Sequence, residues 1–457
     1  MSNRSRLLGV VLYTMPVLFA AVAAHAQDTN YWTLQYGTRG ELLGGTVVGS
    51  AVDLSATFYN PGSLALVKDP KTILTANVFG METIKVSSVP EDTDAPTSRQ
   101  IGIQPSLFAG IAPVKWWGGR WAYSFLTRQK SDFRLTQREG LVIALPGETT
   151  VDSLSVGGEV LFDQYENEQW GGVTYSRPLS DNFGIGMTLY GAYRSQSRST
   201  RQTVEAIGEG GYGASLLDWS DLDYSTFRML AKLGLSADYG KTTLGFAFTT
   251  RSLPIFGHGT ILINRVVIGD ADLDGIADSR ADVTFERDLD ADYRSPFSFA
   301  VGGSHRWTDI TVHATAEYFM KMDPYTVMET GQPQGSPGVT AHPATFQHAL
   351  DEVFNWGVGV EKTFSEKTTA YLSFITDRSA SHPVEPFDIS VSTWDIYHVN
   401  GGVAFVLLGT DLTLGGGFAW GNAPLHATPD SEGILPATIE PSAVNYSRVK
   451  AILGIAL

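Results

Sequence analysis

The feature that most constrains the fold of this chain is a two-residue alternation of side chains, which recurs from about residue 72 to the last residue. Between residues 183 and 194, apolar and aromatic side chains alternate with small or polar ones: Phe183, Ile185, Met187, Leu189 and Tyr193 against Gly184, Gly186, Thr188, Tyr190 and Arg194. The same pattern occupies residues 242–248, 310–318, 354–361, 412–420 and 449–457. This period predicts β-strands with two unlike faces. Mean hydropathy is −0.03, which suits a barrel whose faces alternate and is too polar for a bundle of membrane helices.

The connections between the expected strands alternate between short and long. We predict fourteen strands, beginning near residues 72, 101, 120, 159, 182, 226, 241, 282, 309, 346, 367, 392, 410 and 443. Short turns are expected at 116–119, 179–181, 239–241, 308–309, 365–367 and 409–411, and long loops at 88–100, 139–158, 207–225, 269–281, 329–345, 378–391 and 421–442. Short periplasmic turns, long extracellular loops and an even strand number are typical of outer-membrane barrels. The sequence therefore predicts an all-β fold, a transmembrane antiparallel β-barrel over residues 71–457, located in a Gram-negative outer membrane.

The N-terminus has the layout of a secretory signal peptide. Arg4 and Arg6 form a basic start, residues 7–23 are mostly apolar, and Ala24-His25-Ala26 is a small-x-small cleavage site. We therefore expect residues 1–26 to be removed; the alternative is a single membrane anchor. After residue 26 no run of 18 or more apolar residues remains, which excludes a helical membrane span.

Composition excludes several classes of function. The chain has no cysteine, so disulfides, thiolate metal sites and cysteine nucleophiles are impossible. Without the signal peptide it has 30 basic and 48 acidic residues, a net charge of −18, which argues against nucleic acid as a partner. Aromatic residues near strand ends are candidates for membrane-interface girdles: Trp116, Trp117, Trp121, Tyr175, Trp307, Trp356, Trp394, Tyr397, Trp420 and Tyr446. The alternative for these is ordinary strand propensity.

The stretch before the first strand, residues 27–70, does not alternate. It is rich in glycine and continues with Asp53, Ser55 and Thr57 into Asn60-Pro61-Gly62-Ser63-Leu64. This layout resembles the N-terminal hatch of the FadL family of outer-membrane transporters for long-chain fatty acids and related hydrophobic compounds. The family pattern has Ala after Pro and then Gly, so Gly62-Ser63 departs from it. The alternative is a plain loop leading into the first strand.

The resemblance implies a fourteen-stranded barrel plugged by residues 27–70, with Asn60, Pro61 and Gly62 in a conformational hatch. It also implies capture of the ligand near the extracellular loops, a pocket in the lumen, and release when the hatch shifts, partly sideways through the wall. A plug makes physical sense, because larger barrels otherwise hold a channel, and a hydrophobic solute is stabilised by an apolar pocket rather than by a water-filled pore. Outer-membrane lipid, lipopolysaccharide and the barrel-assembly machinery are the partners that this location implies.

One acidic segment has the spacing of a calcium loop. Asp270, Asp272, Asp274 and Asp278 occupy positions 1, 3, 5 and 9, Gly275 position 6, and Ile276 offers its carbonyl at position 7. Position 12 is Ala281 instead of a bidentate Glu, which excludes a complete EF-hand. Calcium is thus the one ion that the sequence suggests; the alternative is a solvated acidic loop, and we expect no cofactor to be required.

We expect a transporter and no enzyme. The sequence contains no G-x-S-x-G elbow and no H-E-x-x-H helix. Two alternatives stay open: a structural or adhesive surface barrel with a permanently blocked lumen, and an outer-membrane lipid hydrolase using a Ser–His pair on the outer wall, since triads are recognised by geometry. The last residue is Leu457, where most bacterial barrels have an aromatic residue, but the apolar alternation is kept.

Overall fold

A computed structural model describes residues 29–50, 52–68, 70–87, 97–114, 116–144, 153–208, 213–269, 280–331, 339–340, 343–382, 393–425 and 442–457. The expected signal peptide and the acidic segment from Asp270 to Asp278 lie outside these ranges, so both stay predictions. In the described part, no helix is long and apolar enough to cross a membrane.

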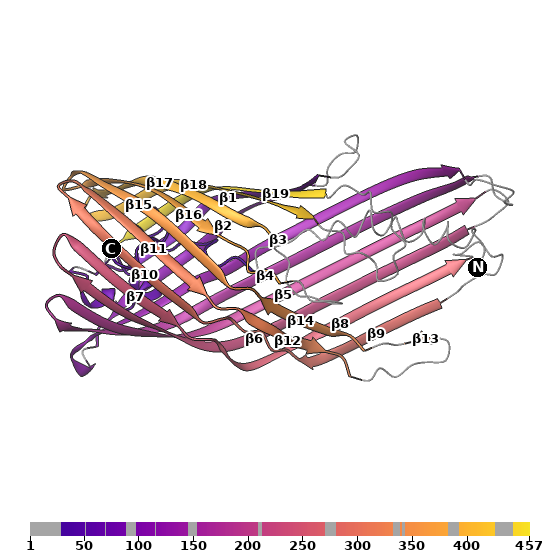
Figure 1. The fold of residues 1–457 in the computed structure, drawn as a ribbon, viewed down its shortest axis with the longest axis horizontal. Coiled ribbons are helices and arrows are strands. Elements are labelled where there is room, and N and C mark those ends of the chain that lie inside the picture. The colour runs from indigo at the N-terminus through magenta and orange to yellow at the C-terminus, as the bar shows by residue number, and fades with distance from the viewer. Residues whose placement is uncertain are drawn as a thin grey trace.

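The described residues form a closed antiparallel β-barrel (Figure 1). Its uninterrupted strands are β1 (Ile73–Ser87), β2 (Thr97–Ala112), β3 (Arg120–Ala144), β4 (Ser153–Ser180), β5 (Phe183–Gly208), β6 (Gly213–Asp238), β16 (Thr368–Asp377), β17 (Asp395–Leu407), β18 (Thr410–Leu425) and β19 (Ser442–Ala456). Antiparallel pairing of β19 with β1 closes the barrel. The fourteen-stranded fold predicted from the alternation is confirmed.

Four of the fourteen wall strands are interrupted, which the alternation did not predict. They consist of β7 (Thr242–Thr249) with β8 (Leu253–Gly269), β9 (Arg280–Asp290) with β10 (Ser298–Trp307), β11 (Ile310–Phe319) with β12 (Met322–Glu329), and β14 (Thr345–Leu350) with β15 (Val353–Ser365). β6 pairs with both β7 and β8, and β10 pairs with β7 while β9 pairs with β8. The two-residue β13 (Val339–Thr340) lies parallel to β9. The breaks at 250–252 and 291–297 therefore lie in adjacent strands and bend the wall.

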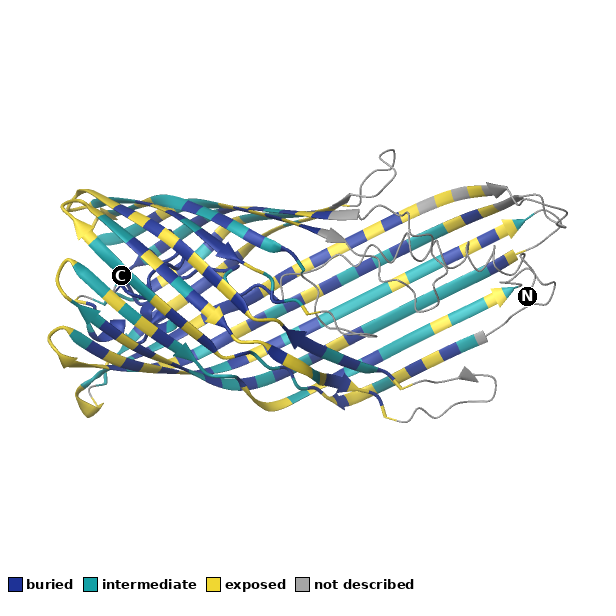
Figure 2. Ribbon diagram, in the orientation of Figure 1, coloured by how far each residue is buried: buried dark blue, intermediate teal, exposed yellow. Residues whose placement is uncertain are grey.

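Exposed and buried positions alternate along the strands (Figure 2). In the half of the barrel that carries the short turns, at the left of the figure, the outward positions are mostly apolar and form a belt. We call this half the lower barrel and the opposite end the upper one. Along β5 the belt runs from Phe183 to Tyr193, which matches the ~9–11 residues that a tilted strand needs to cross a membrane. The next outward side chains are Ser195, Ser197 and Ser199, so the belt ends there. Inward residues of the same part of the strand are glycine, threonine, tyrosine, alanine and arginine.

The wall formed by β3 to β6, β8 and β9 continues far beyond this belt (Figure 1). β4 has 28 residues, whereas β18 and β19 on the opposite side have 16 and 15. The loops predicted at 139–158 and 207–225 are therefore largely strand, a correction with a clear physical cause. Above the belt the outward face is mostly polar, with ion pairs such as Arg138–Glu159 at 2.9 Å and only scattered apolar side chains such as Val142 and Ile207. Apolar alternation therefore no longer marks the strand.

The aromatic girdle is only partly as predicted. Trp116, Trp117 and Trp307 are exposed near the short turns. Trp394 and Tyr446, in contrast, are buried inside the barrel and stack with their ring centroids 6.0 Å apart. They occupy inward positions of the alternation, which a count of aromatic residues near strand ends does not distinguish.

Candidate functional site

Residues 29–68 lie inside the lower half of the barrel and fill it. Nearly all of them are buried, and they include the short helices α2 (Ala56–Tyr59) and η1 (Ser63–Ala65). Asp53 organises this segment, because its carboxylate accepts hydrogen bonds from Arg39 N at 2.9 Å and from Ser55 N at 2.8 Å. The carbonyl of Thr57 accepts hydrogen bonds from the hydroxyls of Thr188 and Tyr190 on β5, each at 2.8 Å. We call residues 29–68 the hatch segment.

The motif Asn60-Pro61-Gly62 sits against the lumen face of β5 and β6. The Asn60 amide donates to the carbonyl of Val48 at 2.7 Å and to that of Leu235 at 2.9 Å, and its side-chain oxygen accepts from Gly62 N. A Cβ atom on Gly62 would lie 2.6 Å from the Gly234 carbonyl oxygen, and one on Gly234 would collide with Asn60. Glycine on both sides thus lets the two backbones touch. A role for the motif in opening remains a prediction.

Two ion pairs, of which only Glu41–Lys450 is buried on both sides, hold the hatch segment to the opposite side of the wall. Arg39 contacts Glu361 of β15 at 2.7 Å, and Glu41 contacts Lys450 of β19 at 3.3 Å. Burial raises the pKa of the Glu41 carboxyl, while Lys450 and the Ser106 hydroxyl act to lower this pKa. Removing one partner of such a pair is costly, because it leaves an uncompensated buried charge.

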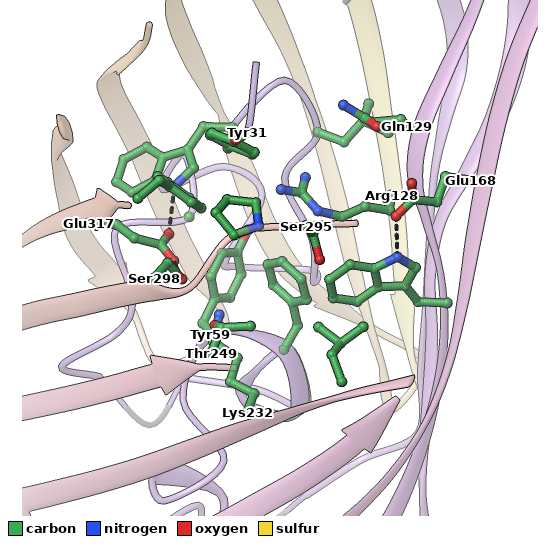
Figure 3. Close-up of a pocket in the computed structure, with 18 of the residues that line it drawn as sticks. Tyr31, Tyr59, Arg128, Gln129, Glu168, Lys232, Thr249, Ser295, Ser298 and Glu317 are labelled. Carbon is green, nitrogen blue, oxygen red and sulfur yellow. Dashed lines mark hydrogen bonds between the residues drawn. The ribbon is translucent and has the colours of Figure 1, made fainter. Parts of the chain in front are cut away.

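A cavity of about 70 Å³ lies directly on the hatch segment (Figure 3). Its floor includes Leu34, Phe58 and Tyr59, and its walls come from β3, β4, β6, β11 and the break between β9 and β10. Trp170 and Phe319 extend the apolar lining. These residues are far apart in the sequence, and the barrel brings them together.

Five charged side chains also line this cavity, and all are buried: Arg128, Glu168, Arg228, Lys232 and Glu317. Arg228 pairs with Glu168 at 2.5 Å, and Glu317 accepts a hydrogen bond from the Trp32 indole at 2.8 Å. Lys232 lies 4.6 Å from the centroid of the Phe58 ring. Nη1 of Arg128 and both Nε and Nη1 of Arg228 have no hydrogen-bond partner within the described ranges. Three cations and two carboxylates leave the lining with a cationic excess.

The sequence did not single out these cavity residues. The one available signal was that Arg194, Glu317 and Glu361 alternate with apolar neighbours, which places charges on the lumen face. Alternation shows that a charge points inward but not which charges meet, because that depends on strand register across the barrel.

The wall has an opening beside this cavity, between β2 and β3. The two strands pair only from Leu107–Leu126 down to Ala112–Trp121. Directly after the Leu107–Leu126 pair, the register of β3 against β4 shifts between Thr127 and Gln129. Thr127, Arg128 and Gln129 are buried in succession there. The shift turns β3 inward. Beyond it, the described residues of β2 before Leu107 and those of β3 after Leu126 form no β-ladder with each other.

The described residues contain neither a complete catalytic triad nor a metal cluster, and the acidic segment Asp270–Asp278 lies outside them. On the outer wall, Ser225 Oγ lies 3.4 Å from His258 Nε2, but no carboxylate of the described residues hydrogen-bonds that histidine, so no triad is complete. Within the same ranges, no group of three or more His, Asp or Glu residues is placed to hold a metal ion.

Comparison with known proteins gives similarity in fold. No protein-family model and no curated protein sequence matches the chain. A FadL homologue from Pseudomonas aeruginosa aligns over 93% of this chain and 99% of its own, with a TM-score of 0.57 and 13% identity. The monoaromatic hydrocarbon channel CymD aligns over 92% of this chain and 97% of its own, with a TM-score of 0.51 and 12% identity. The toluene transporter TodX of Pseudomonas putida aligns over 94% of this chain and 99% of its own, with a TM-score of 0.50 and 14% identity. The plugged barrel described above is thus a shared fold.

Proposed function

We propose that this chain, which has the fold of a FadL homologue and of two hydrocarbon channels, carries hydrophobic small molecules passively across the outer membrane of a Gram-negative bacterium. The proposed substrates are long-chain fatty acids and hydrocarbons, including aromatic hydrocarbons. The apolar belt suits a lipid environment, and with this location go outer-membrane lipid, lipopolysaccharide and the barrel-assembly machinery as partners.

The observation that carries the proposal is an aromatic-lined cavity enclosed between the hatch segment and the barrel wall. A polar solute crosses a membrane most easily through water, whereas a hydrophobic solute gains about 0.8 kcal/mol for each CH₂ group that it buries. Phe58, Tyr59 and Trp170 supply the surface on which such burial takes place.

The small volume of the cavity supports the proposal that the hatch segment moves during transport. At about 70 Å³ it is smaller than the ~150 Å³ engineered cavity that accommodates benzene. A ring or an alkyl chain therefore needs more room than the cavity has in this state. The hatch segment forms the floor, and hydrogen bonds and ion pairs, rather than covalent links, hold it to the wall. Its displacement provides the space.

The test is uptake of labelled oleate and, separately, of labelled toluene by cells that lack their own channels of this type and express the chain. We expect uptake of at least one compound. Two hatch variants, Pro61→Ala and deletion of residues 27–60, should change the rate while the barrel still assembles. Unchanged uptake in both variants would mean that the hatch segment is only a leader into β1.

The competing function is a structural surface barrel with a permanently blocked lumen. The many contacts between the hatch segment and the wall favour it, because each must break before a solute passes. Uptake of neither compound by a barrel shown to be folded and surface-exposed would establish this alternative and reject transport.

A further inference from the structure

Three cations point outward directly above the apolar belt, on three consecutive strands of the wall. On β2 the exposed apolar side chain of Ile101 is followed, at the next outward position, by Arg99. On β1 the last apolar outward side chain is Met81, and Lys85 lies two outward positions farther up. On β3 the first outward residue above the bulge is Lys130. We call Lys85, Arg99 and Lys130 the cationic patch.

Strand register brings the cations of the patch together. Arg99 is opposite Thr83, the outward residue before Lys85, so the two cations are diagonal neighbours on one face of β1 and β2. Such neighbours lie roughly 7–8 Å apart, which lets two long side chains reach one anionic group. Lys130 faces them across the opening in the wall, because it lines the same cavity there as Ile101, the outward neighbour of Arg99.

The described residues do not neutralise the patch. Within the ranges that the structure describes, none of its cations forms an ion pair, whereas Arg134 farther up β3 pairs with a carboxylate of β4. Asp132 is the next outward residue after Lys130. Glu82 points into the barrel and accepts a hydrogen bond from the Tyr446 hydroxyl at 3.4 Å. Three cations against one outward carboxylate leave this side of the wall positive, although the whole chain has a net charge of −16.

Other sides of the wall carry the opposite charge directly above the belt. On β6 and β9, Asp223 and Asp290 lie within two outward positions of the belt, and Glu352 is exposed just before β15. Cations that served only to hold the barrel at the membrane surface would be spread around it. Their restriction to β1, β2 and β3 indicates an anionic ligand with a fixed position on this side.

We propose that the cationic patch binds the phosphate groups of lipid A, the membrane anchor of lipopolysaccharide. The patch points away from the lumen, so a solute inside the barrel is not its ligand. The long loops mark the upper side of the belt as the one that faces out of the cell, where lipopolysaccharide is the anionic lipid. Arginine pairs with phosphate through two parallel hydrogen bonds, and basic residues at a membrane surface attract anionic head groups. The proposal depends on the outer-membrane location and not on transport.

The test uses the purified full barrel in detergent, titrated with lipid A that carries both phosphates and, separately, with lipid A that has lost both. Native mass spectrometry counts the bound lipid. We expect the phosphorylated form to bind at least about tenfold more tightly, a factor that two cations at a membrane surface can supply. The double variant Lys85→Gln, Arg99→Gln should lose this preference, and Lys85→Arg should keep it.

The matched control is Arg138→Gln, Lys321→Gln, which removes the same charge from exposed side chains that pair with Glu159 and Asp323. This control should bind lipid A as the wild type does. Equal affinity of the wild type for both forms of lipid A, or an equal loss in the control and the double variant, would overturn the proposal. Equally tight binding of phosphatidylglycerol would also overturn it, because the patch would then accept any anionic lipid. Uptake measurements test transport separately.

A photoreactive residue gives a second readout that leaves the cations in place. Introduced at Thr97, which is opposite Lys85, it should cross-link lipopolysaccharide in intact cells. Introduced at Ser195, the first outward residue above the belt on β5, it should cross-link much less. No cross-link at residue 97, or equal cross-linking at both positions, would mean that lipopolysaccharide has no preferred side of the wall and would overturn the proposal.

Discussion

At the scale of single residues, glycine on the lumen face of the wall decides how closely the hatch segment can approach. Cβ atoms added at Gly184, Gly186 and Gly234 would all collide with atoms of residues 60–62. On β5 these inward glycines alternate with the apolar side chains of the belt. The same alternation that marks the lipid-facing side therefore also marks the surface on which the hatch packs.

Gly234→Val should loosen the hatch segment without unfolding the barrel. Overpacking of this kind costs typically about 1–3 kcal/mol, which shifts the closed-to-open ratio by about 5-fold to 150-fold. A cysteine placed at the buried Ser63 reports the change, and we expect it to react with a thiol reagent at least about fivefold faster in the valine variant.

The matched control is Gly157→Val, because a Cβ at Gly157 meets no atom within 4 Å. This control should leave the reactivity at residue 63 unchanged. If Gly234→Val also leaves it unchanged, the close backbone contact does not hold the hatch.

At the scale of elements, the long strands divide into a membrane part and a projecting part. In β3 and β4 the outward face changes from apolar near Phe125 and Val173 to charged at Arg134 and Asp163, which form an ion pair. The length of a wall strand is thus not set by the thickness of the apolar belt that it crosses. The contacts of the hatch segment with β4 and β5 are confined to the lower part of these strands.

Deleting residues 139–158 and joining Arg138 to Glu159 through Asn-Gly should therefore leave barrel assembly intact. Arg138 and Glu159 already pair across the two strands, so a two-residue turn fits their register. Heat-dependent electrophoretic mobility, which separates folded from unfolded barrels, measures the result. Deletion of Leu189 alone, within the belt of β5, should prevent assembly, because a one-residue slip moves every following side chain to the other face. Loss of assembly in the first variant would show that the projecting wall is needed for folding.

At the scale of the whole molecule, fourteen strands place the barrel between two regimes. Barrels of about eight strands are filled by their own side chains, and those of about sixteen to eighteen leave an aqueous channel. Here the hatch segment occupies the space that strand number creates, and the buried ion pair Glu41–Lys450 helps to fasten it.

The full chain in a planar lipid bilayer should accordingly show no stable ion conductance, whereas the variant lacking residues 27–60 should conduct. The physical reason is that the deletion removes the filling of the lumen and leaves the wall, whose strands begin at Ile73, complete. Single-channel recording at symmetric salt measures the difference. Open-pore conductance by the full chain would mean that ions bypass the hatch.

The sequence by itself determined the class of fold, the number of wall strands and, in the six strands with clear alternation, the side that faces outward. Period-2 alternation is a local property, because a lipid-facing position must be apolar whatever its partners are. The absence of alternation before β1 set residues 27–70 apart from the wall, whereas Asn60-Pro61-Gly62 was singled out by its resemblance to a family motif. The upper halves of β3 to β6 were mistaken for loops because water, not lipid, surrounds them and removes that requirement.

Only the tertiary structure decided which inward side chains meet. Arg128, Glu168, Arg228 and Lys232 come from three strands and line one cavity because of strand register and barrel closure, which no local pattern encodes. The opening between β2 and β3 depends on a bulge at Arg128, and a one-residue irregularity is invisible in an alternation read over ten residues. The belt follows from the lipid around the molecule, whereas the cavity and the opening between β2 and β3 follow from the contacts within it.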